Sequence, residues 1–220
     1  MKSRLLILLL FTSVTSALMA QKEYRFDYML QYDSYNSISK KTDSQYFFVN
    51  SSDNSFILSV LDRDGKVEMF LKDVNAKIYH SKMPREDFFV LMIAMRCPLT
   101  LNWDNGRKNE TRYEYANARD SLINAVPYYH FEIRPLNKKK DANKNLKPIH
   151  YLYTQSEGFS MPVVLTNRFL YDLWKEGGKK FSGLLSENYI LEADGSKRAL
   201  SKLVTVLKIE KIIIVDTTCK

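Results

Sequence analysis

The stretch Glu23–Asp33, EYRFDYMLQYD, alternates large apolar residues with mostly polar ones. The large residues on one side of this pattern are Tyr24, Phe26, Tyr28, Leu30 and Tyr32. A repeat of two residues is that of a β-strand with one buried and one wet face. The stretch therefore predicts an early strand with an aromatic face and points to a β-rich fold.

Further segments rich in β-branched and aromatic residues predict about ten short strands in all. They cover 45–50, 55–61, 67–71, 75–80, 99–103, 111–115, 128–133, 148–154, 189–192 and 203–215. Asp64-Gly65, Asn105-Gly106 and Asp194-Gly195 are hairpin-turn signals between them. Strands joined by short turns pair antiparallel, and a large sheet twists. We expect a mainly β fold with minor α: one curved, mostly antiparallel, half-barrel-like sheet packed against one or two helices.

The clearest helix covers Asn167–Glu176, with Thr166 as its N-cap and Gly177 at its end. Its apolar face consists of Phe169, Leu170, Leu173 and Trp174. An isolated helix this short is marginal in water, so we expect it to pack on the sheet and to bury Trp174.

The segment Phe88–Met95 can be interpreted in two ways. Pro84 followed by Glu86 and Asp87 suits the first turn of a helix. The apolar run itself equally suits a strand buried on both faces, because periodicity does not separate the two. Both structures stay open for this segment.

The first twenty residues have the layout of a secretory signal peptide. Lys2 and Arg4 precede the apolar run Leu5–Phe11, and small residues lead to Ala20. Cleavage there would leave 21–220 as a single β-rich domain that starts at Gln21. We expect an exported protein that is periplasmic, outer-membrane-associated or secreted.

Export would place the two cysteines, Cys97 and Cys219, in an oxidising compartment. Disulfides form and persist in oxidising compartments, and an even number of cysteines invites a bridge. We expect Cys97 and Cys219 to be bonded to each other in the exported form, although the sequence alone leaves two free thiols open.

Composition argues against several classes of enzyme. The 220 residues include only seven glycines, which form neither GxGxxG nor GxxxxGK[ST], so a phosphate-cradling loop is not expected. His80, His130 and His150 lie on different predicted strands without ligand spacing, and HExxH, CxxC and GxSxG are absent. The sequence predicts no cofactor and no metal, and it favours a protein that is not an enzyme.

Lys138, Lys139 and Lys140 form a basic cluster, and the chain carries a net charge of +8. Such a cluster suits an anionic membrane surface, and its alternative is a solvated loop. Nucleic acid is not an expected partner of an exported protein.

The aromatic load, 13% of the chain, is the most informative feature for function. Candidate ligand-binding residues are Tyr24, Phe26, Tyr28, Phe48, Phe56 and Trp174. A curved sheet could present such residues to an apolar cavity, but an ordinary core could also absorb them.

The layout weakly resembles LolA-like and GLPGLI-type exported proteins of Gram-negative bacteria. The resemblance is carried by Ala20-Gln21, the aromatic strand Tyr24–Tyr32, Phe48-Val49-Asn50 before the segment Phe56–Leu71, and the closing segment Leu203–Val215. It implies a strongly curved antiparallel sheet with helices against its concave face and a cavity for acyl chains or another apolar ligand.

Three functions follow as hypotheses. The leading one is a non-enzymatic exported protein that binds an apolar small molecule, a lipid or a lipidated partner in the curled sheet. The second is a structural or interaction module of the cell envelope without a ligand. The third is a hydrolase whose site is assembled from distant residues.

Overall fold

The computed structural model describes residues 21–36, 41–74, 77–96, 98–102, 113–123, 125–136, 147–154, 158–159, 161–162, 168–176, 182–192 and 194–216. The predicted signal peptide, both cysteines, the turn Asn105-Gly106 and the lysine cluster Lys138–Lys140 lie outside these residues. The corresponding expectations stay predictions.

The described residues form a twelve-stranded sheet. Its strands are β1 (Gln21–Asn36), β2 (Lys41–Asn50), β3 (Asp53–Arg63), β4 (Lys66–Asp73), β5 (Lys77–Pro84), β6 (Met92–Met95), β7 (Leu99–Asn102), β8 (Tyr113–Ile123), β9 (Val126–Pro135), β10 (Ile149–Thr154), β11 (Leu184–Leu191) and β12 (Lys197–Asp216). The helices are α2 (Arg85–Phe88) and α5 (Arg168–Glu176).

The order across the sheet is β7-β5-β4-β3-β2-β1-β12-β11-β10-β9-β8, with β6 paired to β12 off this path. All of these neighbours are antiparallel except β6 and β12, which are parallel. The sheet is open, with β7 and β8 at its ends. The predicted fold class, a mainly β protein with one mostly antiparallel sheet and few helices, is confirmed.

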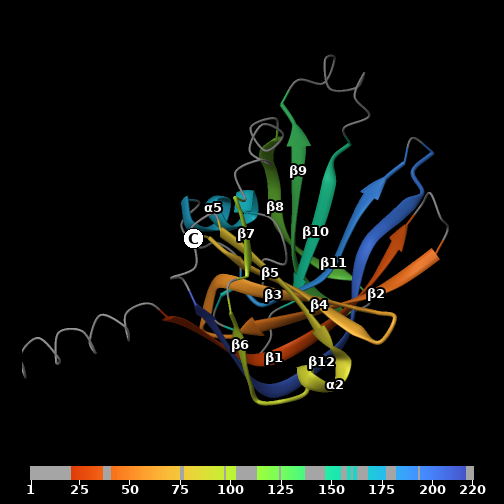
Figure 1. Cartoon of the computed structure of the whole chain (residues 1–220). Coiled ribbons are helices and arrows are strands. Elements are labelled where there is room, and N and C mark those ends of the chain that lie inside the picture. The colour runs from red at the N-terminus through yellow and green to blue at the C-terminus, as the bar shows by residue number, and fades with distance from the viewer. Residues whose placement is uncertain are drawn as a thin grey trace, which may run out of the picture.

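The sheet bends sharply about its central strands. Figure 1 shows β8, β9 and β10 rising away from the layer that contains β1 to β5. The two central strands are much longer than the short strands expected: β1 has 16 residues and β12 has 20. Long central strands allow one sheet to contribute to two separate cores.

The turn between β3 and β4 forms as predicted. Asp64 and Gly65 both have positive φ, 53° and 71°, which is the conformation that a two-residue type I′ hairpin needs and that an Asp-Gly pair favours. Arg63 and Lys66 pair directly across the turn.

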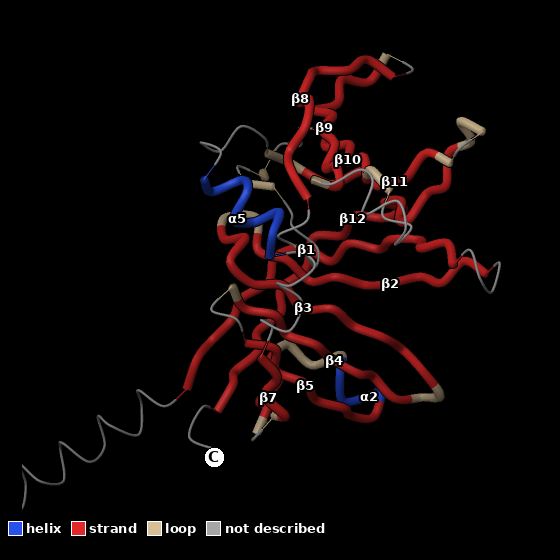
Figure 2. The backbone as a smooth tube through the Cα atoms, turned by 90° about the horizontal axis from the view of Figure 1, so that it is seen from above, coloured by secondary structure: helices blue, strands red, loops and turns tan. Residues whose placement is uncertain are grey.

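Two hydrophobic clusters stabilise the sheet. The α5 cluster consists of Leu30, Tyr32, Phe47, Val49, Ile57, Phe131, Ile133, Tyr151, Tyr153, Phe159, Leu170, Trp174, Leu184 and Leu185. The α2 cluster consists of Tyr24, Phe26, Phe48, Leu58, Val60, Val67, Met69, Leu71, Tyr79, Phe88, Ile93, Met95, Ile213 and Val215. In Figure 2 the two helices lie on opposite sides of β1 to β3.

The single aromatic face expected for β1 is therefore wrong. Tyr24 and Phe26 belong to the α2 cluster, whereas Leu30 and Tyr32 belong to the α5 cluster. The ladder between β1 and β12 shifts register between Phe26 and Tyr28. A bulge bends a strand and increases its twist, so one alternating pattern serves two cores.

The segment that the sequence left ambiguous contains the end of a helix and a short strand, but the expected strand buried on both faces is wrong, because only Ile93 and Met95 of β6 are buried. The turn of helix α2 ends at Phe88, and β6 begins at Met92. The predicted helix at 167–176 is present as α5. The predicted burial of Trp174 is confirmed, because only 5% of this residue is exposed.

Candidate functional site

An apolar cavity lies between β1, β2, β3, β4 and α2 and has a volume of about 220 Å³. Its lining consists of Met29, Tyr46, Phe48, Val60, Asp62, Val67, Arg85, Phe88 and Phe89. The walls are apolar apart from Asp62 and Arg85, whose side chains form an ion pair at 3.1 Å. We refer to this cavity as the α2 pocket.

Helix α2 forms one wall of the pocket because the chain turns over the sheet at Pro84. Pro84 precedes the helix, and Glu86 and Asp87 lie in its first turn, where negative charge is favourable. Phe88 is buried, and its ring meets Phe48 edge to face with the ring centroids 5.5 Å apart. The helix ends after one turn, which leaves Phe89 at the margin of the pocket.

Lys211 on β12 fixes the chain that follows α2. Its ammonium group donates hydrogen bonds to the carbonyl oxygens of Phe88 and Val90, and it lies 4.3 Å from the centre of the Phe88 ring. Burial lowers the pKa of Lys211 to about 8. The backbone N–H of Ile212 also donates to the carbonyl of Leu91 at 2.9 Å. Strand β12 thus holds the backbone carbonyls of Phe88, Val90 and Leu91 beside the pocket.

An exposed apolar segment continues from the pocket. Phe89, Val90, Leu91 and Met92 are exposed by 73%, 52%, 51% and 49%. Scattered apolar residues on a surface are normal, but four in succession beside a pocket are typical of an interaction surface. We call Phe89–Met92 the apolar ridge.

The six predicted ligand-binding residues do not converge on one cavity. Tyr24, Phe26 and Phe48 are core residues of the α2 cluster, and Phe56 packs against it. Trp174 is in the α5 cluster, and Tyr28 packs against it through Phe159, with ring centroids 4.7 Å apart. Only Phe48 lines the α2 pocket.

Tyr24 also has a polar role. Its hydroxyl donates to the buried carboxylate of Asp73 at 2.7 Å, and Lys22 pairs with the same carboxylate. Desolvation, reinforced by Asp73, raises the pKa of Tyr24 far above its usual range. This arrangement stabilises a buried polar group in the core and does not face the pocket.

The sequence analysis missed Phe88, Phe89, Arg85 and Lys211 as site residues. The one available signal was the apolar run Phe88–Met95, which is too long for the four-residue strand β6 alone. Lys211 carried no signal, because a lysine in a β-branched segment is expected to be exposed.

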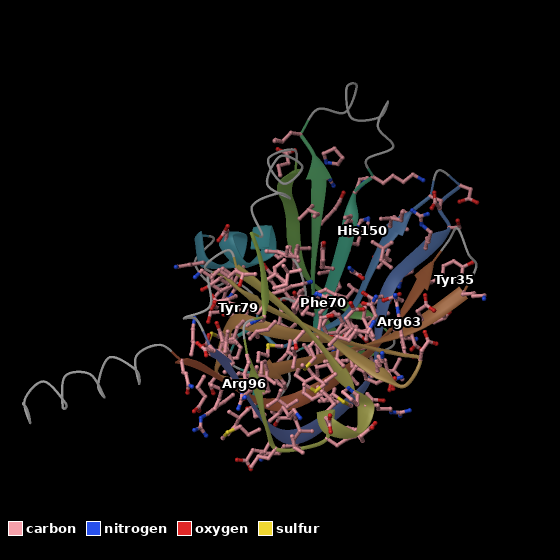
Figure 3. All side chains as sticks on the ribbon, in the orientation of Figure 1. Tyr35, Arg63, Phe70, Tyr79, Arg96 and His150 are labelled. Atoms are coloured by element: carbon pink, nitrogen blue, oxygen red, sulfur yellow. The ribbon has the colours of Figure 1, made fainter. Side chains whose placement is uncertain are left out.

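Two of the three histidines, His130 and His150, lie next to each other on neighbouring strands. His130 on β9 lies opposite Leu152, and His150 on β10 lies opposite Glu132, so the two histidines are diagonal neighbours. Nε2 of His130 and Nδ1 of His150 are 3.2 Å apart. A hydrogen bond between two imidazoles needs one bare ring nitrogen, so both rings cannot be charged while it persists. Figure 3 shows His150 on the rising strands, away from Tyr79 and Phe70.

The surroundings of this pair are aromatic and charged. The Tyr189 ring stacks on His150 with centroids 4.8 Å apart. Glu132 forms a bidentate ion pair with Arg134, at 2.6 and 2.8 Å. Within the described ranges, no group of three or more histidine, cysteine, aspartate or glutamate side chains is placed to hold a metal ion.

We predict that the protein loses stability as the pH falls below about 6.5, because burial lowers the pKa of His150 in the folded state. An unfolded histidine takes up a proton near its ordinary pKa of about 6.5, whereas folded His150 resists protonation, so acid favours unfolding. Urea midpoints at pH 7.5 and 5.5 measure this effect. His150→Phe should reduce the difference between them, and an undiminished difference would contradict the assignment.

None of the helices in the described part of the chain combines the length and apolarity needed to cross a bilayer.

No protein-family model and no curated protein matches the chain. Two of the solved structures that match this chain do so at a low level of similarity. The complex structure of Pseudomonas aeruginosa MucA/MucB matches with a TM-score of 0.35 and 7% identity over 84% of this chain and 52% of that chain. The crystal structure of MucB in complex with MucA(peri) matches with a TM-score of 0.36 and 7% identity over 86% and 51%.

This chain thus spans about half the length of those chains. At these TM-scores neither likeness assigns a family or a partner, and the resemblance to LolA-like proteins remains a prediction.

Proposed function

We propose that this protein is an exported, non-enzymatic binding protein that accepts one compact apolar group of its ligand in the α2 pocket. The observation that carries the proposal is the continuity of an apolar pocket with the apolar ridge Phe89–Met92. Pocket and ridge together offer a concave anchor site with apolar surface beside it, which is the arrangement of a binding hot spot.

The volume of the α2 pocket limits the size of the ligand group that can bind in it. A dry cavity of about 150 Å³ holds benzene, whereas pockets for drug-sized molecules start at about 300 Å³. The α2 pocket, at about 220 Å³, lies between these values. It suits an aromatic ring or a branched aliphatic group, and we propose such a group in preference to a whole acyl chain.

The rim of the pocket supports binding without catalysis. The ion pair of Arg85 and Asp62 is more than a third exposed on the arginine side, so it can orient a polar part of the ligand at the mouth. Neither His130 nor His150 lines this pocket. We therefore propose that the pocket binds its ligand without a chemical step.

Indole, a compact aromatic probe, tests the proposal. We expect indole to shift the methyl NMR signals of Val60, Val67 and Met29, which line the pocket. Phe89→Asp should raise the apparent Kd at least tenfold, because it places a carboxylate at the apolar margin close to Asp62. Phe89 is 73% exposed, so stability should change by no more than about 0.5 kcal/mol.

Leu122→Asp is the matched control, because Leu122 is 75% exposed on strand β8, away from the pocket lining. Equal weakening in both variants, or no indole shifts at millimolar concentration, would reject the proposal. Mass spectrometry of gently purified protein tests the size argument separately. A long-chain lipid bound in stoichiometric amount would contradict the preference for a compact group.

A further inference from the structure

His130 on β9 and His150 on β10 bring two imidazole rings together on one face of the rising strands, where Figure 3 marks His150. The residues that follow them, Phe131 and Tyr151, belong to the α5 cluster. Successive side chains of a strand point to opposite faces of the sheet. The two histidines therefore lie on the face that is turned away from the α5 cluster.

The sheet and a neighbouring ring hold the two imidazoles in place. The ladder between β9 and β10 runs from Ile133 to Tyr129 without a register shift. The Tyr189 ring stacks on His150 with the centroids 4.8 Å apart, and its centroid lies 6.4 Å from that of the His130 ring. A site that is built on paired strands and held by packing is more precise than one on loops.

The separation of the facing nitrogens fits two ligands of one metal ion. Nε2 of His130 and Nδ1 of His150 are 3.2 Å apart. Two histidine nitrogens on a tetrahedral zinc ion, each at about 2.0–2.1 Å from it, lie about 3.3 Å from each other. A small rotation of the rings would aim both nitrogens at a shared ion without a movement of the backbone.

The charged side chains beside the pair are joined in ion pairs of opposite sign. Glu132 lies opposite His150 in the ladder and forms the bidentate ion pair with Arg134. Lys197 pairs in the same way with Glu187 on β11. Each of these pairs is neutral as a whole, so neither repels a cation strongly.

Strand β8 adds one residue of each sign. Arg119 lies opposite His130, and Glu114 lies opposite Arg134. The six charged residues around the pair are thus three basic and three acidic ones. This balance leaves the two imidazoles as the feature that selects a ligand.

Imidazole nitrogens suit zinc, copper and nickel ions, whereas magnesium and calcium ions prefer oxygen ligands. Two histidines supply half of a tetrahedral set, and water or an atom of a further ligand would complete it. His150 is buried, but His130 is only partly buried, so an ion can reach the pair from the His130 side.

We propose that Nε2 of His130 and Nδ1 of His150 form a two-histidine site for a divalent ion of the late first transition row, with zinc as the reference ion. The site is independent of the α2 pocket, since neither histidine lines that pocket.

Zinc titration at pH 7.5 tests the proposal on untagged protein that has been stripped of metal with EDTA and dialysed. We expect calorimetry to show one zinc ion bound at this pair in each chain. In NMR spectra of the imidazole nitrogens, the signals of His130 Nε2 and His150 Nδ1 should move. His130→Gln and His150→Gln should each raise the apparent Kd for zinc at least tenfold.

His80→Gln is the matched control, because it removes the third histidine of the chain, whose Nε2 lies 2.8 Å from Glu68. Its zinc affinity should stay within twofold of wild type, and Phe89→Asp, which impairs the α2 pocket, should also bind zinc normally. Circular dichroism checks that each variant is folded. If His150→Gln does not fold, His130→Gln decides the result, since its side chain is less buried.

Three results would overturn the proposal. They are equal zinc affinity in His130→Gln and wild type, movement of the His80 signals without those of His130 and His150, and the absence of binding at millimolar zinc.

Discussion

Trp174→Ala is expected to lower the free energy of unfolding by about 3–5 kcal/mol, the usual cost of emptying a large aromatic site in a core. Trp174 is 5% exposed within the α5 cluster, and its ring lies 5.9 Å from that of Tyr171. Helix α5 has only nine residues, which is too short to persist without tertiary packing. Removing the indole should therefore release the helix as well as create a cavity.

Urea unfolding followed by circular dichroism measures this loss. Lys66→Gln, at the exposed hairpin between β3 and β4, is the control and should change stability by no more than about 0.5 kcal/mol. Equal midpoints for Trp174→Ala and wild type would mean that the helix is not held by the α5 cluster.

Phe26→Ala should cost a similar amount, about 3–5 kcal/mol, because Phe26 is a central residue of the other cluster. It is 2% exposed and meets Phe56 and Phe48 edge to face, with centroids 5.4 and 6.5 Å apart. Edge-to-face pairs add about 0.5–1.5 kcal/mol beyond the burial of area. Loss of both contacts places the expected value in the upper part of the range.

This variant also separates the two interpretations of the aromatic load. If Phe26 serves the core, Phe26→Ala loses stability in the absence of any ligand. Denaturant unfolding of ligand-free protein is the measurement, with Phe26→Leu as a milder control that keeps part of the packing. A variant that unfolds like wild type but fails to bind indole would restore the ligand-binding interpretation of Phe26.

The sequence predicted local structure best where the local signal was complete. The alternation in 23–33, the Asp64-Gly65 turn and the apolar face of 167–176 each specify an element through backbone preference and side-chain period. Their strand, turn and helix are present. The mostly antiparallel sheet follows from the short turns that join most of its strands.

The candidate site was predicted poorly, because its residues come from segments whose contacts are long-range. Phe48 was named from its strand pattern and lines the pocket, whereas Phe88 and Phe89 belonged to a run that fits helix or strand equally well. Lys211 is 123 residues from the Phe88 carbonyl that it binds. No local pattern encodes such a contact, and its energetic importance arises only once both groups are buried.

The sequence by itself determined that this chain forms alternating strands with tight turns and one amphipathic helix, because side-chain period and turn chemistry act over a few residues. Tertiary structure alone decided how the aromatic residues of β1 divide between two clusters, since the register shift after Phe26 depends on β12. It also decided that His130 meets His150 and that α2 closes an apolar pocket. Each of these depends on strand pairing between distant segments, which the cooperative packing of the whole sheet selects.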